Sequence, residues 1–167
     1  LQMLQQDGWL TSSGKNKMVT PITWKDIEEI YELRLVNEAF ALDLAGRTFS
    51  ETNSQHMQKL LDQMASLIGE NSYMVDYLEI DKSFHLYIAE IGGNRKLFNL
   101  MKSIMEQFVR IAFITLKKGD LRLKESHQEH VQIVKACAEY DFEKAKKASK
   151  AHIQSWFNAL KENWEEI

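Results

Sequence analysis

The residues in this sequence with the clearest chemical potential are an aspartate and a histidine that lie four positions apart. Asp81 and His85 occur within the apolar stretch YLEIDKSFHLYIAEIGGN. In a helix this spacing places both side chains on one face, about 5–6 Å apart, while Phe84 projects from another side. The same face carries apolar neighbours: Tyr77, Leu78, Ile88 and Ala89. Taken alone, the pair is typical of an internal hydrogen bond between a carboxylate and an imidazole N–H.

Two further histidines lie on apolar faces of other expected helices. His130 shares a face with Ile133 and Val134, and His152 shares one with the small residues Ala145 and Ser149. Three segments thus each turn a possible ligand inward, and neutral imidazole and carboxylate bind zinc, nickel and similar ions. Each histidine alone is also consistent with a hydrogen-bonded core residue. Taken together, four residues predict a divalent metal site: Asp81, His85, His130 and His152.

The two remaining histidines are weaker candidates. His127 precedes His130 by three residues and is the alternative ligand or a supporting group, nearer the edge of the bundle. His56 lies beside glutamines on an amphipathic segment, so we expect it on the surface.

Arginines within apolar helices are a second unusual feature. Arg34 and Glu38 are four residues apart in YELRLVNEAFALDLA, where most positions are apolar. One interpretation is an ion pair within the helix, and the other is a guanidinium that binds an organic anion through paired hydrogen bonds. The two interpretations are compatible if Glu38 only orients Arg34. Arg110, in EQFVRIAFITL, allows the same reasoning.

Composition limits the classes of protein that this chain can belong to. The 167 residues suffice for one domain with a sizeable core, and the net charge of -3 excludes attraction to nucleic acid by overall charge. A single cysteine excludes an intrachain disulfide and fits a reducing compartment. No apolar run approaches the roughly 18 residues of a membrane span, and no signal pattern opens the chain. We expect a soluble, cytoplasmic protein.

The scarcity of helix-breaking residues predicts an all-α fold. One proline and seven glycines leave long helix-forming stretches after Pro21. Thr23, Ser50 and Asp141 are the expected N-caps. We predict an antiparallel bundle of about six to seven helices, with the residues from 30 to 45 in a central, buried helix. The expected helices cover residues 24–48, 50–71, 72–91, 95–117, 123–139 and 142–164.

The first 22 residues have a different character. LQMLQQ is typical of a helix end, and two short extended runs, Trp9–Ser12 and Met18–Ile22, follow around a Ser-Gly-Lys-Asn turn. A helix end followed by a hairpin cannot bury a core alone. The segment is therefore predicted to be an arm or the remnant of a second domain.

Three segments together resemble a known family. They are EIYELRLVNEAFALDLA, IDKSFHLYIAEIGGNRKLFNLM and SHQEHVQIVKACAEYDFEKAKKASKAHI. They are similar to the ligand-binding FCD domain of GntR-type transcription regulators, FadR subgroup, from Thr23 to Leu160. The resemblance implies an antiparallel bundle in which the aspartate and the three histidines hold a divalent metal, zinc first and nickel, manganese or iron as alternatives. A small carboxylate effector would complete the coordination, and Arg34, Asn94 and Arg110 are the candidates to bind it.

The resemblance extends to the N-terminal piece. Residues 1–22 are similar to the end of the recognition helix and the wing of a winged helix-turn-helix domain, and residues 23–167 to the effector-binding domain. Lys15 and Lys17 would lie at the wing tip, beside DNA phosphates or the minor groove. Most of that DNA-binding domain is absent from this sequence, so we expect it to bind operator DNA poorly alone.

The functional prediction is a sensing domain of a bacterial transcription regulator, a homodimer without membrane contacts and not an enzyme. The alternative is a metal-dependent hydrolase that uses the same site, since a His/Asp metal with open positions can activate water. That reading needs a free carboxylate as base. Glu79 and Glu90 fall on other helix faces, and Glu129 is expected to point away. A plain helical interaction module with a buried polar network is the third reading.

Overall fold

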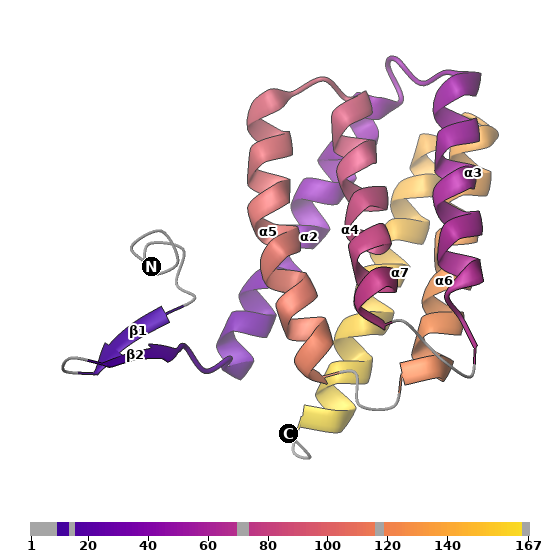
Figure 1. The fold of residues 1–167 in the computed structure, drawn as a ribbon. Coiled ribbons are helices and arrows are strands. Elements are labelled where there is room, and N and C mark those ends of the chain that lie inside the picture. The colour runs from indigo at the N-terminus through magenta and orange to yellow at the C-terminus, as the bar shows by residue number, and fades with distance from the viewer. Residues whose placement is uncertain (1–9, 14–15, 70–73, 116–118, 165–167) are drawn as a thin grey trace.

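The computed structural model describes residues 10–13, 16–69, 74–115 and 119–164 of the chain. Within these residues it is a helical bundle preceded by a short β-hairpin, so the predicted all-α class is confirmed (Figure 1). The elements are β1 (Leu10–Ser13), β2 (Asn16–Val19), α2 (Trp24–Ala45), α3 (Glu51–Ser66), α4 (Met74–Ile91), α5 (Arg95–Thr115), α6 (Gly119–Ala138) and α7 (Phe142–Asn163).

Side-chain caps fix the starts of three helices, as predicted. The hydroxyls of Thr23 and Ser50 accept from the backbone three residues on, in capping boxes. Asp141 caps α7 through the backbone N–H of Lys144. These caps satisfy N–H groups that have no partner within the helix.

Three helix boundaries differ from the prediction by three residues or more. Helix α2 ends at Ala45 rather than residue 48, α3 ends at Ser66 rather than residue 71, and α6 begins at Gly119 rather than residue 123. A glycine and an aspartate at the start of α6 do not break the helix, because the first turn tolerates both and favours negative charge.

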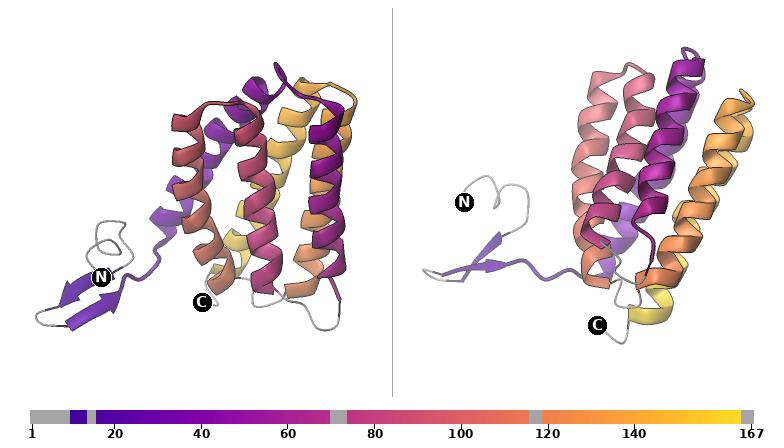
Figure 2. Two further views of the ribbon diagram at one scale, coloured as in Figure 1. Left: turned by 45° about the horizontal axis from the view of Figure 1, so that its top comes forward. Right: turned by 45° about the vertical axis from the view of Figure 1, so that its right-hand side comes forward.

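The helices alternate in direction and close into a ring. Helix α3 packs against α4 and α6, α6 packs against α7, and α2 packs against α4, α5 and α7. The hairpin projects from the end of the bundle where α2 begins and α7 ends (Figures 1 and 2). Within the described ranges, none of the helices is long and apolar enough to cross a membrane.

The hairpin is shorter than predicted. Strand β1 pairs antiparallel with β2 from Leu10 opposite Val19 to Ser13 opposite Asn16. The second strand, β2, therefore starts two residues before the start of the predicted run Met18–Ile22 and ends three residues before its end. LQMLQQ and Lys15 lie outside the described residues, and Lys17 lies in β2 opposite Ser12.

The apolar core forms two clusters, with polar residues between them along α2 and α7. The hairpin-end core contains Ile27, Ile30 and Trp156 among others. The distal core contains Leu42 and Ala145, together with residues of α3, α4 and α6. Between these positions lie buried polar side chains: Arg34 and Glu38 on α2, and Ser149 and His152 on α7.

Helix α2 is not buried on all sides, so that expectation was wrong. Leu33 is 43% exposed, Val36 70% and Phe40 45%, whereas the inward Arg34 is 0% exposed. The helix uses one side to pack on its three neighbours. No other described segment covers the apolar outer side.

Candidate metal centre

Four side chains from three helices meet in the centre of the bundle. Asp81 and His85 come from α4, His130 from α6 and His152 from α7. All four are buried, and one ligand atom from each lies within 4.8 Å of the others. The structure thus brings together the four residues that the sequence singled out.

The distances within the cluster suit a shared ion. His130 Nε2 lies 3.2 Å from His85 Nε2 and 3.2 Å from Asp81 Oδ1. Two ligand atoms about 2.1 Å from one ion, at angles between tetrahedral and octahedral, lie about 3.0–3.4 Å apart. The cluster could therefore hold a divalent metal with little rearrangement of these three groups.

Carboxylates on the far side of two imidazoles orient the rings. His85 Nδ1 lies 2.8 Å from Glu38 Oε2, and His152 Nδ1 lies 2.7 Å from Glu129 Oε2. An Nδ1–H that donates to a carboxylate leaves the Nε2 lone pair facing the cluster. Among the described residues, the buried His152 Nε2 and Asp81 Oδ2 have no hydrogen-bond partner. Buried ligand atoms whose lone pairs have no hydrogen-bond partner fit a metal site.

Both orienting carboxylates are fully engaged. Glu38 Oε1 accepts from Arg34 Nε at 2.7 Å, and its Oε2 accepts from Ser149 Oγ at 3.2 Å. Glu129 accepts two bonds from Arg122, at 3.1 and 2.8 Å. The expectation that Glu129 points away from the site was wrong, because it reaches His152. Glu129 follows Arg122 by seven residues, two turns along one face of α6, and this spacing is a sequence signal for the Arg122–Glu129 pair.

The electrostatics give three of the four candidate ligands the protonation state that a metal requires. Burial alone would raise the pKa of Asp81, but the hydrogen bond and charge of His130 outweigh it and hold that pKa well below its usual range. Burial lowers the pKa of His130, and it lowers the pKa of His152 to about 3. At neutral pH the carboxylate is ionised and these two imidazoles are neutral, as ligands must be.

Arg34 lies directly beside the cluster. Its guanidinium is buried over the ring of Phe108, 4.0 Å from the centroid, and Nη2 lies 3.3 Å from His85 Nε2. The predicted ion pair with Glu38 is present. Arg34 Nη1 has no hydrogen-bond partner within the described part of the chain.

The other two candidate effector residues lie elsewhere. Asn94 is exposed at the start of α5, where Oδ1 accepts from the backbone of Lys96 and Leu97. Arg110 donates to the backbone carbonyl of Thr20, next to the hairpin. Their assignment to the effector site stays a prediction that these contacts do not support.

One neighbouring aromatic residue and the two remaining histidines are not members of the Asp/His cluster. Phe84 is fully buried and its ring packs edge-on against His130, with centroids 4.8 Å apart, so it forms a wall of the cluster rather than packing elsewhere. His127 Nε2 lies 3.2 Å from the Leu61 carbonyl on α3. His56 is exposed, as predicted, and packs on Tyr87.

Comparison with known families identifies the class of protein that has this bundle. The FCD domain family matches residues 29–155, and the chain belongs to this family. It is the FCD domain of a transcriptional regulator of the GntR family. The predicted family is therefore confirmed.

Two curated relatives align along nearly the whole chain. The uncharacterized HTH-type transcriptional regulator YdhC of Bacillus subtilis (strain 168) is 27% identical over 161 residues, which cover 95% of this chain and 69% of the relative. The Nta operon transcriptional regulator of Aminobacter aminovorans is 26% identical over 164 residues, covering 97% and 75%.

Solved structures share the fold at low sequence identity. McbR/YncC of E. coli superposes with a TM-score of 0.82 at 16% identity, covering 96% of this chain and 81% of that one. A GntR family member from Pseudomonas syringae pv. tomato str. DC3000 gives 0.71 at 19% identity, covering 98% and 68%. These likenesses establish the architecture.

Proposed function

We propose that this chain senses a small organic acid through a divalent metal held by Asp81, His85, His130 and His152. The observation that supports it most directly is the convergence of four buried side chains with ligand atoms within 4.8 Å of one another, where His152 Nε2 and Asp81 Oδ2 have no hydrogen-bond partner among the described residues. Zinc is the first candidate, because nitrogen and oxygen ligands suit it, and nickel, manganese and iron are alternatives.

The chemistry of the site favours an anionic effector. A bound ion would offer an open coordination position to a carboxylate. Arg34 adds a guanidinium whose Nη1 has no partner among the described residues, and Glu38 and Phe108 hold it in place. Because a guanidinium binds carboxylates through paired hydrogen bonds, Arg34 is the proposed effector-binding residue.

Helix α5 offers a connection from the site to the hairpin. Arg34 packs on Phe108 of α5, and two residues further on Arg110 donates to the carbonyl of Thr20. A shift of Arg34 on effector binding would move α5 and with it the chain that leads into the hairpin. Such coupling requires the effector to bind the two arrangements with different affinity.

The N-terminal residues extend the proposal toward DNA. Residues 1–22 would be the end of a winged helix-turn-helix domain of the FadR subgroup, with Lys15 and Lys17 near operator DNA. Residues 23–167 would form the effector domain of a homodimer that acts on DNA in the bacterial cytoplasm. A hydrolase is less favoured, because Glu38 and Glu129, the carboxylates beside the histidines, are both engaged.

Metal analysis of the purified chain tests the metal site. We expect close to one divalent ion per chain after metal supplementation, anomalous scattering at the four ligands, and loss of the ion in Asp81→Asn and His130→Ala. His127→Ala is the matched control, because within the described part of the chain its Nε2 lies beside the Leu61 carbonyl and not in the cluster. A wild-type chain that stays metal-free after supplementation would contradict the proposal.

A thermal-shift screen of small organic acids, with and without zinc, tests the sensor function. We expect the effector to raise the melting temperature of the metal-loaded chain and to have little effect on the chelated chain or on Arg34→Gln. An acid that stabilises the chelated chain equally would show that the metal is not part of effector binding.

A further inference from the structure

The candidate metal ligands and Arg34 are closed off from solvent. Asp81, His85, His130 and His152 are each 2% exposed or less, and Arg34 is 0% exposed. A close-packed interior leaves no path for an organic acid. An acid that reaches these residues, as the proposed sensor function requires, must therefore pass between helices that separate locally.

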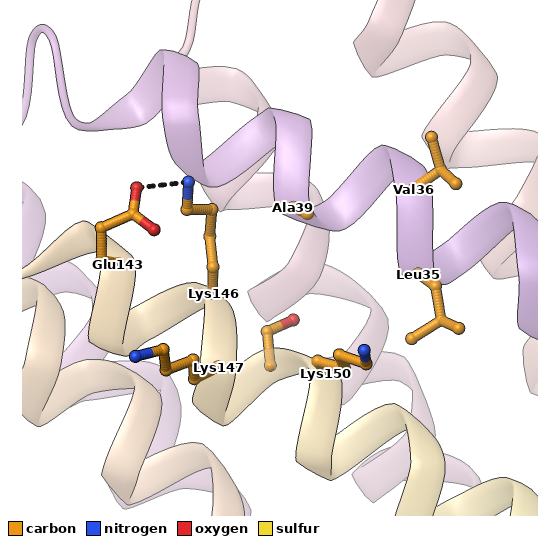
Figure 3. Close-up of a pocket in the computed structure, with 8 residues that line it drawn as sticks. Leu35, Val36, Ala39, Glu143, Lys146, Lys147 and Lys150 are labelled. Atoms are coloured by element: carbon orange, nitrogen blue, oxygen red, sulfur yellow. Dashed lines mark ion pairs between the residues drawn. The ribbon is translucent and has the colours of Figure 1, made fainter.

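A groove on the surface lies over the contact between α2 and α7 and has a volume of about 280 Å³ (Figure 3). Leu35, Val36 and Ala39 form its α2 side, and lysines of α7 lie on the other side. Ser149 of α7 also lines the groove, although it is only 3% exposed. The groove therefore leads from solvent to a side chain inside the bundle.

Ser149 also borders an inner space beside the cluster. This space is lined by Glu38, Ala41 and His85 as well, and in the closed bundle it is too narrow for a water molecule. Ser149 Oγ donates to Glu38 Oε2 at 3.2 Å, and Glu38 in turn contacts Arg34 and His85 at 2.7 and 2.8 Å. Ser149 thus separates the outer groove from the proposed effector residue, and its hydrogen bond to Glu38 closes the path.

Aromatic packing holds α2 and α7 together at both ends of their contact. Toward the hairpin, the rings of Tyr31 and Phe157 stack with centroids 4.1 Å apart. At the other end, a Cβ placed on Gly46 would lie 2.8 Å from the ring of Phe142, so the chains are in close contact there. Buried aromatic surface resists separation. We therefore expect the two helices to separate between these ends rather than at them.

Polar groups join the two helices between the aromatic contacts. Within the described ranges, the polar contacts from α2 to α7 are the hydrogen bond from Ser149 to Glu38 and the partly exposed ion pair of Lys146 with Asp43, at 3.2 and 2.6 Å. An ion pair at the surface contributes at most about 1 kcal/mol, and water can replace the partners of a hydrogen bond. The groove therefore lies where separation costs least.

The charge of the groove favours an anion. Lys147 and Lys150 are exposed and make no ion pair within the described part of the chain. Lys146 is paired with Asp43 and Glu143, so its charge is compensated. A surface hollow with excess positive charge raises the local concentration of anions and their rate of association.

Another approach to the cluster, along α6, carries the opposite charge. Glu129, which contacts His152, has 23% of its side chain exposed, and the side chain of Glu125 is 53% exposed. Arg122 pairs with both carboxylates. Two carboxylates around one guanidinium leave an excess of negative charge, so this side repels an organic acid.

We propose, on the basis of the sensor function above, that the organic acid enters the bundle through the groove between α2 and α7. Lys147 and Lys150 attract its carboxylate. The hydrogen bond from Ser149 to Glu38 breaks as the helices separate, and the acid passes through the inner space to Arg34. The two lysines act on the rate of entry more than on the final affinity, because they lie on the surface and not at the cluster.

Cysteine labelling tests this route without metal or effector. Ser149→Cys places a thiol at the closing contact, and Ala41→Cys places one in the inner space behind it. We expect the anionic reagent sulfonatoethyl methanethiosulfonate to label both at least about tenfold faster than Cys137, which reports on global opening of the same molecule. Cys137 is the matched control, because it is 1% exposed and away from the groove.

Peptide mass spectrometry follows each thiol separately, and circular dichroism checks that each variant is folded. The Ala41→Cys variant keeps the hydrogen bond from Ser149 to Glu38, so it tests the route even if Ser149→Cys does not fold. Introduced thiols that react no faster than Cys137 would overturn the proposal.

The charge of the reagent tests the role of the lysines. The rate ratio of the anionic reagent to its cationic trimethylammonium counterpart should fall about tenfold when Lys147→Gln and Lys150→Gln are combined, at low ionic strength. Salt at about 0.5 M should remove most of this difference. Lys144→Gln with Lys161→Gln is the matched control, because it removes the same charge from α7 outside the groove. An unchanged ratio in the first pair, or an equal fall in the control, would overturn the proposal.

The route and the metal site can fail separately. A chain that binds no zinc would contradict the metal site, and the labelling rates would still decide the route. A chain that binds zinc while both introduced thiols stay unreactive would leave the metal site intact and overturn the route.

Discussion

The two sides of helix α2 reverse the usual distribution of polarity. Inside the bundle, Arg34 and Glu38 are 0% and 4% exposed. On the outside, Leu33, Val36 and Phe40 are 43% to 70% exposed. The inner charges are paired with each other and lie beside the cluster, whereas the outer apolar residues remain largely open to solvent. At these positions α2 therefore turns an ion pair toward the cluster and leaves large apolar side chains open to solvent.

The energetic costs of the two sides differ in kind. A buried ion pair is stabilising only while every member has its partner, because an unpaired buried charge is costly. An exposed valine costs little, since much of any folded surface is apolar. Substitutions on the inner side should therefore change stability strongly, and substitutions on the outer side should change it little. The following predictions test this distinction, from the largest expected effect to the smallest.

Removal of the inner carboxylate should have the largest effect. Glu38→Ala leaves the buried Arg34 unpaired and removes the acceptor for His85 and Ser149, so we expect a loss of about 3–5 kcal/mol in the free energy of unfolding. Urea denaturation measures it. The double variant Arg34→Met with Glu38→Leu is the control and should lose much less, because no charge is left unpaired. A single variant within about 1 kcal/mol of wild type would show that the pair is not energetically coupled.

Acid should destabilise the metal-free chain below pH 6.5. The pKa of His152 is lowered from 6.5 to about 3 by burial, so the unfolded chain takes up that proton first as the pH falls. Burial alone would raise the pKa of Glu129, but hydrogen bonds from His152 and Arg122 lower it from 4.5 to about 2. In both cases the unfolded state binds more protons, so stability falls with falling pH.

The urea midpoint of the chelated chain, followed from pH 6.5 down to pH 4.5, measures this acid effect. Above pH 4.5 the decline should come mainly from the histidines, and below it Glu129 adds to it. His56→Gln should show the same decline, because His56 is exposed. A midpoint that does not change over this range would contradict the buried, neutral state of His152.

Loss of the carboxylate behind His152 should weaken metal binding moderately. Glu129→Gln keeps the size of the side chain but removes the charge that orients the imidazole, and we expect affinity for zinc to fall about 10–100-fold. Competition with a chromogenic chelator measures it. Glu125→Gln is the matched control, since Glu125 pairs with the same Arg122 at 3.5 Å and is exposed. Equal losses in both variants would argue against the orienting role.

Shortening an exposed apolar side chain on the outer side of α2 should have the smallest effect on folding. Val36→Ser should change the free energy of unfolding of the dilute chain by less than about 0.5 kcal/mol, as exposed substitutions usually do. Ile30→Ala, at a position 3% exposed on the same helix, should cost about 2–5 kcal/mol. Thermal or urea unfolding at low concentration compares the two. A large loss in Val36→Ser would mean that the outer side belongs to the core of the monomer.

Local rules explain which features could be predicted from the sequence. The three caps depend on residues within three positions of each other, so Thr23, Ser50 and Asp141 identified helix starts directly. The metal candidates were visible because imidazoles and a carboxylate are rare on apolar helix faces. Errors arose where distant segments decide, as for the exposed side of α2 and the direction of Glu129.

The sequence by itself determined the helical class, the caps, the family and the four cluster residues, because these follow from short-range spacing and residue type. Only the tertiary structure decided that Glu38 and Glu129 orient His85 and His152, that Arg110 binds Thr20 rather than facing the cluster, and that α2 is open on one side. Those contacts join different helices. Their geometry depends on how the helices rotate against one another, and a helical pattern fixes the faces of each helix but not the neighbour that each face meets.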